Sequence, residues 1–382
     1  MKSPKSLDIA ITNQCNLRCK YCSHFTSAGE VEGDLPAEEW LRFFDELGRL
    51  AVMSVCLQGA EAFFRRDLPQ IIEGIVRNRM RFSVLSNGTL ITDELAAFLA
   101  STGRCDSVQV SIDGSIPTTH DAIRGEGSFL RAVEGVRRLM AAGVPTAVRV
   151  TIHRGNVQDL ESAAALLLDE IGLPGFSTNS AEYMGLCRQN ADQLLLTPPE
   201  RSAAMETLLK LVRRYGDRIS ANAGPLAEAR TWLQMEKARQ EGGESQFGQG
   251  RLSGCGGTMS KMGVRADGVM VPCIQMSHVE LGRINRDDLA TVWRDHPELA
   301  RIRRRQELRL RDFEFCRGCD YVDYCTGNCP AIAYTVLGLE DHPAPDACLR
   351  RFLEGGGWIP DESLLAAAQS SSDCEKCGPA HD

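Results

Sequence analysis

The sequence predicts an α/β fold in which helices cover a parallel sheet, followed by a smaller cysteine-rich region. Across the first 215 residues, short apolar runs alternate six times with segments whose apolar residues recur at intervals of three and four. Six strand–helix units in succession imply a parallel sheet with its helices outside. The cysteines gather in two places, one near the start of the chain and one after residue 254.

The first six strands and their helices can be assigned in order. The helix over 36–50 illustrates the pattern, because Trp40, Phe43, Leu47 and Leu50 fall on one face. We expect strands over 7–12, 55–57, 81–85, 107–112, 146–152 and 176–179, and helices over 36–50, 67–78, 93–100, 129–142, 157–168 and 203–215. Reactive groups in such sheets gather where the strands end, so the residues after each strand are candidate site residues.

Composition excludes several classes of protein. The chain has 382 residues, of which 43% are hydrophobic, and a formal net charge of −8, which argues against nucleic-acid binding. No apolar run is long enough to span a membrane, and the basic start is not followed by an export segment. The chain has fifteen cysteines, and we expect a cytoplasmic protein in which they do not form disulfides and the clustered ones bind metal.

A cysteine triplet follows the first predicted strand. Cys15, Cys19 and Cys22 have the spacing CxxxCxxC, with Tyr21 before the last cysteine. Thiolates favour iron–sulfur clusters, zinc or copper(I), and three of them on a four-iron cubane leave one iron open. This spacing resembles the signature of the radical S-adenosylmethionine (SAM) enzymes, whose fold is a partial (β/α)6 TIM-like barrel. The resemblance implies that the open iron chelates the amino and carboxylate groups of SAM and that Tyr21 lies near the adenine. Zinc held with a remote fourth ligand is the alternative.

The turns after three other predicted strands also resemble motifs of the radical SAM family. The segment 58–63 resembles the family's Gly-Gly-Glu-Pro turn, which meets the SAM amino group, but has alanine at positions 60 and 62. The turns at 86–88 and 111–114 resemble its further SAM-contacting turns. The SAM-binding residues that the resemblance implies are Tyr21, Gly59, Glu61, Ser86, Asn87, Ser111 and Asp113. Ordinary turn and cap chemistry is the alternative for these polar residues, and Arg124 is either a carboxylate partner for a ligand or a solvated side chain.

A second cysteine array lies in the C-terminal part of the chain. The pair Asp267-Gly268 predicts a hairpin with Cys255 and Cys273 at its outer ends. The later cysteines resemble the CxxCxxxxxCxxxC core of the SPASM extension of radical SAM enzymes, a small domain with a hairpin and short helices. Carried over from that family, auxiliary cluster I takes Cys255, Cys273 and Cys329, and cluster II takes Cys316, Cys319, Cys325 and Cys348. The resemblance thus implies three [4Fe–4S] clusters and SAM as cofactors.

One departure concerns the ligands of cluster I. Many relatives have another cysteine shortly after the first hairpin cysteine, and this chain has none in 256–262. We expect an open iron that binds a substrate atom such as a cysteine thiolate, or else a fourth ligand from Cys187, His278 or the tail cysteines Cys374 and Cys377. A zinc ribbon is the alternative for the whole array. We expect Cys56 and Cys105 to be small buried hydrophobes.

The expected domain boundaries follow composition. The chain becomes polar and rich in Gly, Gln and Glu between Glu236 and Gly250. We expect a barrel in residues 1–225, a linker in 226–252, an SPASM domain in 253–355 and a C-terminal tail in 356–382.

The family resemblance implies the function. SPASM enzymes largely act on ribosomally made peptides, and the chain resembles maturases found beside short precursor peptides, including the SynChlorMet type. We expect a radical SAM oxidoreductase that oxidises or crosslinks a peptide, with an electron donor such as flavodoxin or ferredoxin and a separate leader-binding protein. The alternatives are a sulfatase-maturase-like protein oxidase, although Ile274 replaces the acidic residue expected there, a small-molecule dehydrogenase or epimerase, and an iron–sulfur scaffold without catalysis.

Overall fold

The computed structural model describes residues 3–25, 33–242, 250–254 and 256–364. A ten-stranded sheet in the order β10-β9-β8-β1-β2-β3-β4-β5-β6-β7 forms its centre. The strands are β1 (Ser6–Thr12), β2 (Ser54–Gly59), β3 (Arg81–Ser86), β4 (Cys105–Ser111), β5 (Thr146–Ile152), β6 (Phe176–Ser180), β7 (Ile219–Ala221), β8 (Lys261–Val264), β9 (Val269–Val271) and β10 (Gly282–Arg283). Neighbouring strands from β1 to β7 pair in parallel, as an α/β barrel requires.

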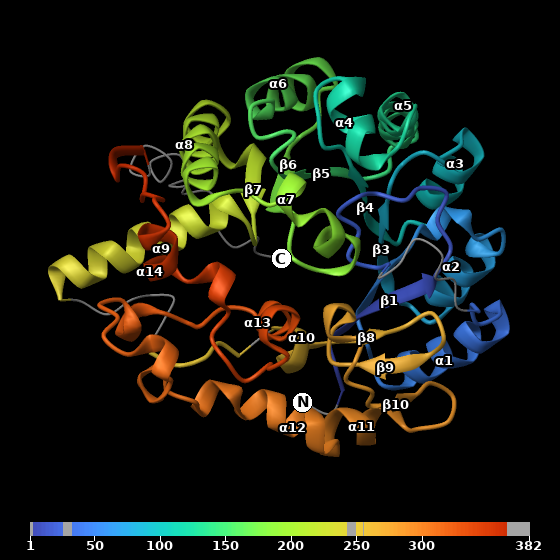
Figure 1. Cartoon of the computed structure of the whole chain (residues 1–382). Coiled ribbons are helices and arrows are strands. Elements are labelled where there is room, and N and C mark those ends of the chain that lie inside the picture. Colours follow the sequence, from blue (N-terminus) through green and yellow to red (C-terminus); the bar gives the residue numbers. More distant parts are fainter. Residues whose placement is uncertain (1–2, 26–32, 243–249, 255, 365–382) are drawn as a thin grey trace, which may run out of the picture.

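Helices surround the curved sheet (Figure 1). Those of the first part are α1 (Ala37–Arg49), α2 (Leu68–Arg77), α3 (Asp93–Ser101), α4 (Pro117–Arg124), α5 (Ser128–Ala141), α6 (Leu160–Ala165), α7 (Ala191–Leu194), α8 (Pro198–Tyr215) and α9 (Pro225–Glu241). The C-terminal part adds α10 (Gly256–Met259), α11 (Leu289–Asp295), α12 (Pro297–Arg304), α13 (Pro330–Leu337) and α14 (Leu349–Glu354). None of the helices among the described residues is long and apolar enough to cross a bilayer.

The two faces of each barrel strand differ in chemistry. In β2, Val55 and Leu57 are buried at 1% and 0% exposure, whereas Cys56 between them is only half-buried. Side chains of a strand alternate between its faces, so one face packs in the main core and the other lines the barrel interior. The interior face carries polar residues on several strands, including Gln58 and Arg149. The interior face of the barrel is therefore partly polar.

The predicted α/β barrel is confirmed, and the structure extends it at both edges. The short strand β7 pairs with β6 and adds a seventh parallel strand beyond the six expected. At the other edge β8 pairs in parallel with β1, joining Ser6 to Lys261 and Ile9 to Val264. The hairpin β8–β9 thus belongs to the same sheet as the barrel.

The linker expected over 226–252 is wrong for most of its length, because α9 occupies Pro225–Glu241. Its apolar face buries Leu226, Ala229 and Trp232, and the Trp232 ring packs on Phe352 of α14 with centroids 4.5 Å apart. The polar residues that suggested a linker lie on the other face of this helix or in the segment after it. A helix with one apolar stripe needs partners to cover it, and α8 provides most of that contact, with Phe352 of α14 adding to it.

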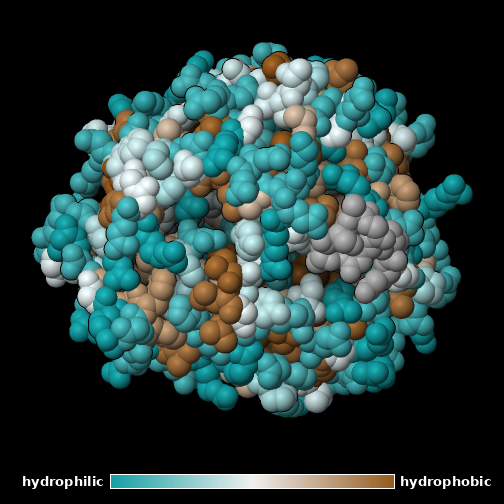
Figure 2. Space-filling view, in the orientation of Figure 1, coloured by the Kyte–Doolittle hydropathy of each residue, from teal (hydrophilic) through white to brown (hydrophobic). Residues whose placement is uncertain are grey.

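The surface seen in Figure 2 is mostly hydrophilic, with separate hydrophobic patches. One of these lies over the end of α13, where Val336, Leu337 and Leu339 are 36%, 41% and 56% exposed. This patch adjoins α13 residues that line the central cavity described below.

Candidate active site

The loop that carries Cys15, Cys19 and Cys22 is anchored where β1 ends. Thr12 Oγ1 donates to Asp34 Oδ2 (2.5 Å), and the Asn13 amide donates to the other oxygen of Asp34 (2.8 Å). The Cys22 amide donates to the Cys19 carbonyl (3.0 Å), which closes a turn between the last two cysteines. All three cysteines are half-buried and close enough to influence one another electrostatically.

The chemistry of this triplet fits a metal cluster. Burial raises the pKa of Cys15, and burial together with nearby negative charges raises the pKa of Cys19 to about 12. Three thiolates held together without a cation are therefore costly, and bound iron would offset their repulsion. The Cys15 sulfur also receives the Leu17 amide (3.3 Å) and the Asn87 amide group (3.7 Å), the kind of hydrogen bonding that supports a ligating thiolate. Among the described residues, no three His, Cys, Asp or Glu side chains are placed to hold a single metal ion.

The turn after β2 is hydrogen-bonded to the cysteine loop. The Ala60 amide donates to the Thr12 carbonyl (3.1 Å), and the Glu61 amide donates to the Gln14 carbonyl (3.0 Å). Gly59 has φ +122°, and a Cβ on it would lie 2.5 Å from the Thr12 carbonyl oxygen. Ala60 is not among the described residues with positive φ, so alanine fits there without strain. Only the first glycine of the turn is sterically required in this chain.

We expect Gly59→Ala to abolish SAM cleavage and Ala60→Gly to leave it unchanged. The new methyl group at position 59 must displace backbone, whereas the change at position 60 removes a side chain from an ordinary conformation. The measurement is 5′-deoxyadenosine formed by the anaerobically reconstituted protein under dithionite. Equal activity of the Gly59→Ala variant would contradict the assigned role of this turn.

The Glu61 carboxylate joins the ends of β2 and β3. Its Oε1 accepts from Ser86 Oγ (2.8 Å) and the Phe63 amide (3.1 Å), and its Oε2 accepts from the Asn87 amide (2.7 Å). Burial outweighs these bonds and raises the pKa of Glu61. The Asn87 side chain donates to Asn16 Oδ1 (2.9 Å) as well as facing Cys15. Of the predicted SAM contacts, Glu61 and Ser86 are therefore bonded to each other, and Asn87 holds the cysteine loop.

The Asp113 carboxylate is a second buried group that connects separate elements through hydrogen bonds. Its Oδ2 accepts from Arg124 Nε (2.5 Å) and from the Tyr21 hydroxyl, and its Oδ1 accepts from the Thr151 amide (2.8 Å). Burial alone would raise the pKa of Asp113, but Arg124 lowers it below its usual value, so the carboxylate is charged. Arg124 is 6% exposed and lies over the Tyr21 ring. The alternative of a solvated Arg124 is wrong, because this guanidinium is buried against Asp113. Ser111 is half-buried where β4 ends.

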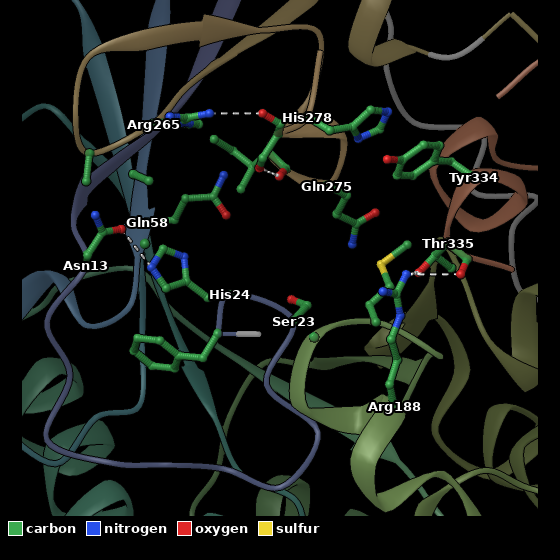
Figure 3. Close-up of a pocket in the computed structure, with 18 residues that line it drawn as sticks. Asn13, Ser23, His24, Gln58, Arg188, Arg265, Gln275, His278, Tyr334 and Thr335 are labelled. Carbon is green, nitrogen blue, oxygen red and sulfur yellow. Dashed lines mark hydrogen bonds between the residues drawn. The ribbon is translucent and has the colours of Figure 1, made fainter. Parts of the chain in front are cut away.

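A cavity of about 430 Å³ lies beside the cysteine loop (Figure 3). It joins the loop after β1, the end of β2, the 3₁₀ helix Gly185–Asn190, the segment after β9 and helix α13. Its hydrogen-bonding side chains include Asn13, His24, Gln58, Arg188, Arg265, Gln275, His278 and Tyr334. None of its lining residues is acidic. The sequence analysis does not identify Gln58, Gln275 and Tyr334 as candidate site residues. Nothing in the local sequence indicates that the end of β2, the segment after β9 and helix α13 meet.

Four of the C-terminal cysteines line one small cavity. Cys316, Cys319, Cys325 and Cys348 surround it together with apolar residues such as Leu310. Burial and the charges of the other three sulfurs raise the pKa of Cys316 to about 12, so these thiols also fit a bound cationic centre. They are the residues expected to hold cluster II.

The residues expected at cluster I are only partly described. Cys273 precedes the 3₁₀ helix Ile274–Met276, and Cys329 lies directly before α13. Cys255 and the tail cysteines Cys374 and Cys377 fall outside the described residues. Cys187, considered as a fourth ligand, is fully buried beside Ile123 and Leu194. His278, the other candidate, bonds to Glu340.

The two remaining cysteines differ from each other. Cys105 is 7% exposed in the core. Cys56, expected among apolar neighbours, lies on the interior face of β2, bonds to Ser83 and is influenced by Asp8 and Lys261. That expectation is wrong because the interior face of this barrel is polar.

Comparisons with known proteins agree with this geometry. The family model of the radical SAM superfamily matches residues 9–167, and the SPASM iron–sulfur cluster-binding domain model matches 255–320. The chain is 28% identical to Fe-coproporphyrin III synthase of Methanosarcina barkeri (86% of this chain, 84% of the relative) and 24% identical to PqqA peptide cyclase of Ruegeria pomeroyi (93% and 92%). It is 27% identical to mycofactocin maturase MftC of Mycobacterium tuberculosis (91% and 83%).

Solved structures share the fold. Streptococcus suis SuiB bound to precursor peptide SuiA superposes with a TM-score of 0.68 at 17% identity, over 91% of this chain and 76% of SuiB. The enzyme anSMEcpe with bound AdoMet gives 0.69 at 17% identity, over 96% and 100% of the two chains. The chain is thus a radical SAM protein with a C-terminal SPASM iron–sulfur cluster-binding domain.

Proposed function

We propose that this chain is an oxidoreductase that cleaves SAM and removes hydrogen from a ribosomally made peptide, leaving an oxidised or crosslinked product. The observation that carries the proposal is a cavity that touches both the cysteine loop and the SPASM hairpin. A substrate group placed there would lie between the SAM site and the proposed cluster I. The names of PqqA peptide cyclase, mycofactocin maturase and SuiB with its precursor peptide support a peptide substrate.

The proposed cofactors are SAM and three [4Fe–4S] clusters. Cys15, Cys19 and Cys22 would hold the first, Cys255, Cys273 and Cys329 cluster I, and Cys316, Cys319, Cys325 and Cys348 cluster II. SAM at the first cluster supplies a 5′-deoxyadenosyl radical, which is cofactor chemistry. The protein contributes binding and orientation: Gly59 lets the β2 turn approach the cysteine loop, and Tyr21 is held by Asp113.

The size of the cavity limits what it can hold. Sites for small ligands range from about 300 to 1,000 Å³, so 430 Å³ accommodates one or two side chains of a peptide. The rest of a precursor would lie outside, and the exposed apolar residues at the end of α13 adjoin that exit. A separate leader-binding protein remains part of the proposal.

An anionic tetrapyrrole is the second candidate, because the 28% identical relative is Fe-coproporphyrin III synthase and the cavity has no acidic residue. Several substrate carboxylates would need several available cations. Arg265 already pairs with Asp267 (2.6 Å) and Glu280 (2.9 Å), and Arg188 is the arginine of the cavity with no carboxylate partner among the described residues. This charge balance favours the peptide.

Co-expression with the short open reading frames beside the gene tests the proposal. We expect one encoded peptide to lose two hydrogens by mass spectrometry, and the purified protein to form 5′-deoxyadenosine with SAM and reduced flavodoxin. A peptide of unchanged mass that gains deuterium in heavy water would instead indicate an epimerase. Conversion of iron-coproporphyrin III would favour the second candidate, and absence of 5′-deoxyadenosine would indicate a scaffold.

A further inference from the structure

We propose that His278 is the base that takes a proton from the substrate in the central cavity, and that Glu340 positions its ring for this task. The inference rests on the proposed function and names a catalytic residue for it. Three observations carry it: the place of the ring in the cavity wall, its bond to a carboxylate, and the lack of any other suitable base among the lining residues.

The His278 ring is fixed on two sides. Its Nε2 lies 2.7 Å from Glu340 Oε1, and its plane stacks on the Tyr334 ring with centroids 3.4 Å apart and an angle of 7°. The side chains of His278 and Glu340 are 27% and 13% exposed, so the pair is sheltered but reachable from the cavity. Figure 3 places His278 and Tyr334 next to each other at one edge of the cavity.

The bond to Glu340 sets the tautomer of the imidazole. Burial would raise the pKa of Glu340, but its bond to His278, its backbone amide and Arg301 lower it, so this carboxylate is ionised. Arg301 Nη2 lies 3.4 Å from Glu340 Oε2, and Arg301 also pairs with Asp341 (2.5 Å). An ionised carboxylate can only accept, so Nε2 carries the hydrogen, and in the neutral imidazole the lone pair is therefore on Nδ1. In the described part of the chain, Nδ1 has no hydrogen-bond partner.

Removing two hydrogens from a substrate requires such a base. One hydrogen atom would leave with the 5′-deoxyadenosyl radical that SAM would supply, which would break a substrate C–H bond and form 5′-deoxyadenosine. The substrate would then have to give up one electron, which an oxidised iron–sulfur cluster held by the SPASM cysteines would accept, and one proton. The structure offers His278 Nδ1 for that proton, and the sum is two electrons and two protons, as a loss of two hydrogens demands.

The other side chains that line the cavity are less suitable as proton acceptors than His278. His24 also donates through Nε2, to Asn13 Oδ1 (3.0 Å), but its acceptor is a neutral amide, which stabilises a protonated ring less than the Glu340 carboxylate does. Arg188 and Arg265 do not accept protons at working pH. Arg265 donates to the Ser277 carbonyl (3.1 Å) and is paired with Asp267 and Glu280 on the hairpin side of His278. The lining contains no Asp or Glu, so His278 is the group best suited to accept a proton.

The test uses the full-length reconstituted protein and the substrate that the wild type modifies in the co-expression experiment. We expect His278→Ala to lower the two-hydrogen product by about 10²–10⁴-fold, the usual contribution of a general base. Iron content and 5′-deoxyadenosine formation should persist, and added imidazole should restore product. Glu340→Gln should lower product less. The control is His296→Asn, which lies at the start of α12 outside the cavity and keeps a capping side chain.

A second measurement needs no substrate. In ¹⁵N-histidine-labelled protein, with the His278→Ala spectrum as assignment, we expect the wild type to show a protonated Nε2 and a bare Nδ1, and Glu340→Gln to show a mixture of tautomers. A protonated Nδ1 in the wild type would overturn the inference. So would normal product from His278→Ala, or a loss that imidazole does not restore. A wild type that modifies no peptide overturns the proposed function instead, which the co-expression experiment reveals separately.

Discussion

Replacing Cys19 with serine is expected to reduce 5′-deoxyadenosine formation to background and to remove about four iron atoms per chain, the content of one cubane. Cys19 lies between Cys15 and Cys22 in a loop anchored by Thr12 and by the turn after β2. A hard hydroxyl is a poor substitute for a soft thiolate on iron, so the remaining two sulfurs cannot retain the cluster.

The matched control is Cys105→Ala. Cys105 is buried at 7% exposure in the hydrophobic core and has no expected part in metal binding. We expect this variant to keep its iron and its activity and to lose about 1 kcal/mol in the free energy of unfolding. Iron is measured after anaerobic reconstitution, and product by chromatography. If Cys19→Ser kept full iron content, the triplet would not be the SAM-binding cluster.

The second large effect is expected at Asp113. Asp113→Ala removes the partner of the buried Arg124 and the acceptor for the Tyr21 hydroxyl and the Thr151 amide. Breaking one side of a buried ion pair costs about 3–5 kcal/mol, because the other charge stays buried without compensation. We expect a loss of this size in urea unfolding of the apoprotein, together with weaker SAM cleavage because Tyr21 is released.

Further variants test whether the uncompensated charge of Arg124 causes this loss of stability. Asp323→Ala breaks the exposed pair with Arg311, whose side chains are 52% and 67% exposed, and should cost less than about 1 kcal/mol. The double variant Asp113→Leu with Arg124→Met should be more stable than Asp113→Ala, because it leaves no unpaired charge. A double variant as unstable as the single one would show that the uncompensated charge is not the cause.

The sequence predicts the fold and the cysteine sites because their signals are local. The alternation of apolar periods marks the strands and helices, and the cysteine spacings need no tertiary information. The linker prediction fails at α9, because polar residues interrupt its apolar stripe and the partners that bury the stripe, chiefly α8 with Phe352 of α14, are not evident from the sequence. The environment of Cys56 is misjudged for a related reason, since the sequence does not reveal that the barrel interior is polar.

The contacts between residues of the cavity wall are the part of the site that the sequence predicts least. His278 and Glu340 are 62 residues apart and meet only because α13 packs beside the segment after β9. His278 could be named from sequence as a possible ligand, but its bond to Glu340 and its stacking on Tyr334 exist only in three dimensions. For Arg124 the sequence leaves a ligand partner and a solvated side chain as alternatives, and the burial of its guanidinium against Asp113 excludes only the solvated one.

The backbone pairing of β8 with β1 has a consequence for how the molecule can be divided. β1 leads directly to Cys15, and β8 begins the hairpin that ends at Cys273. Sliding one of these strands by a single residue would turn its side chains to the opposite face. The register between β1 and β8 therefore sets the position of the two cysteine regions relative to each other. Cutting the chain before residue 261 would also leave β1 as an open edge. The C-terminal third is therefore not a detachable module, and transplanting it onto another barrel would require carrying over the matching first strand.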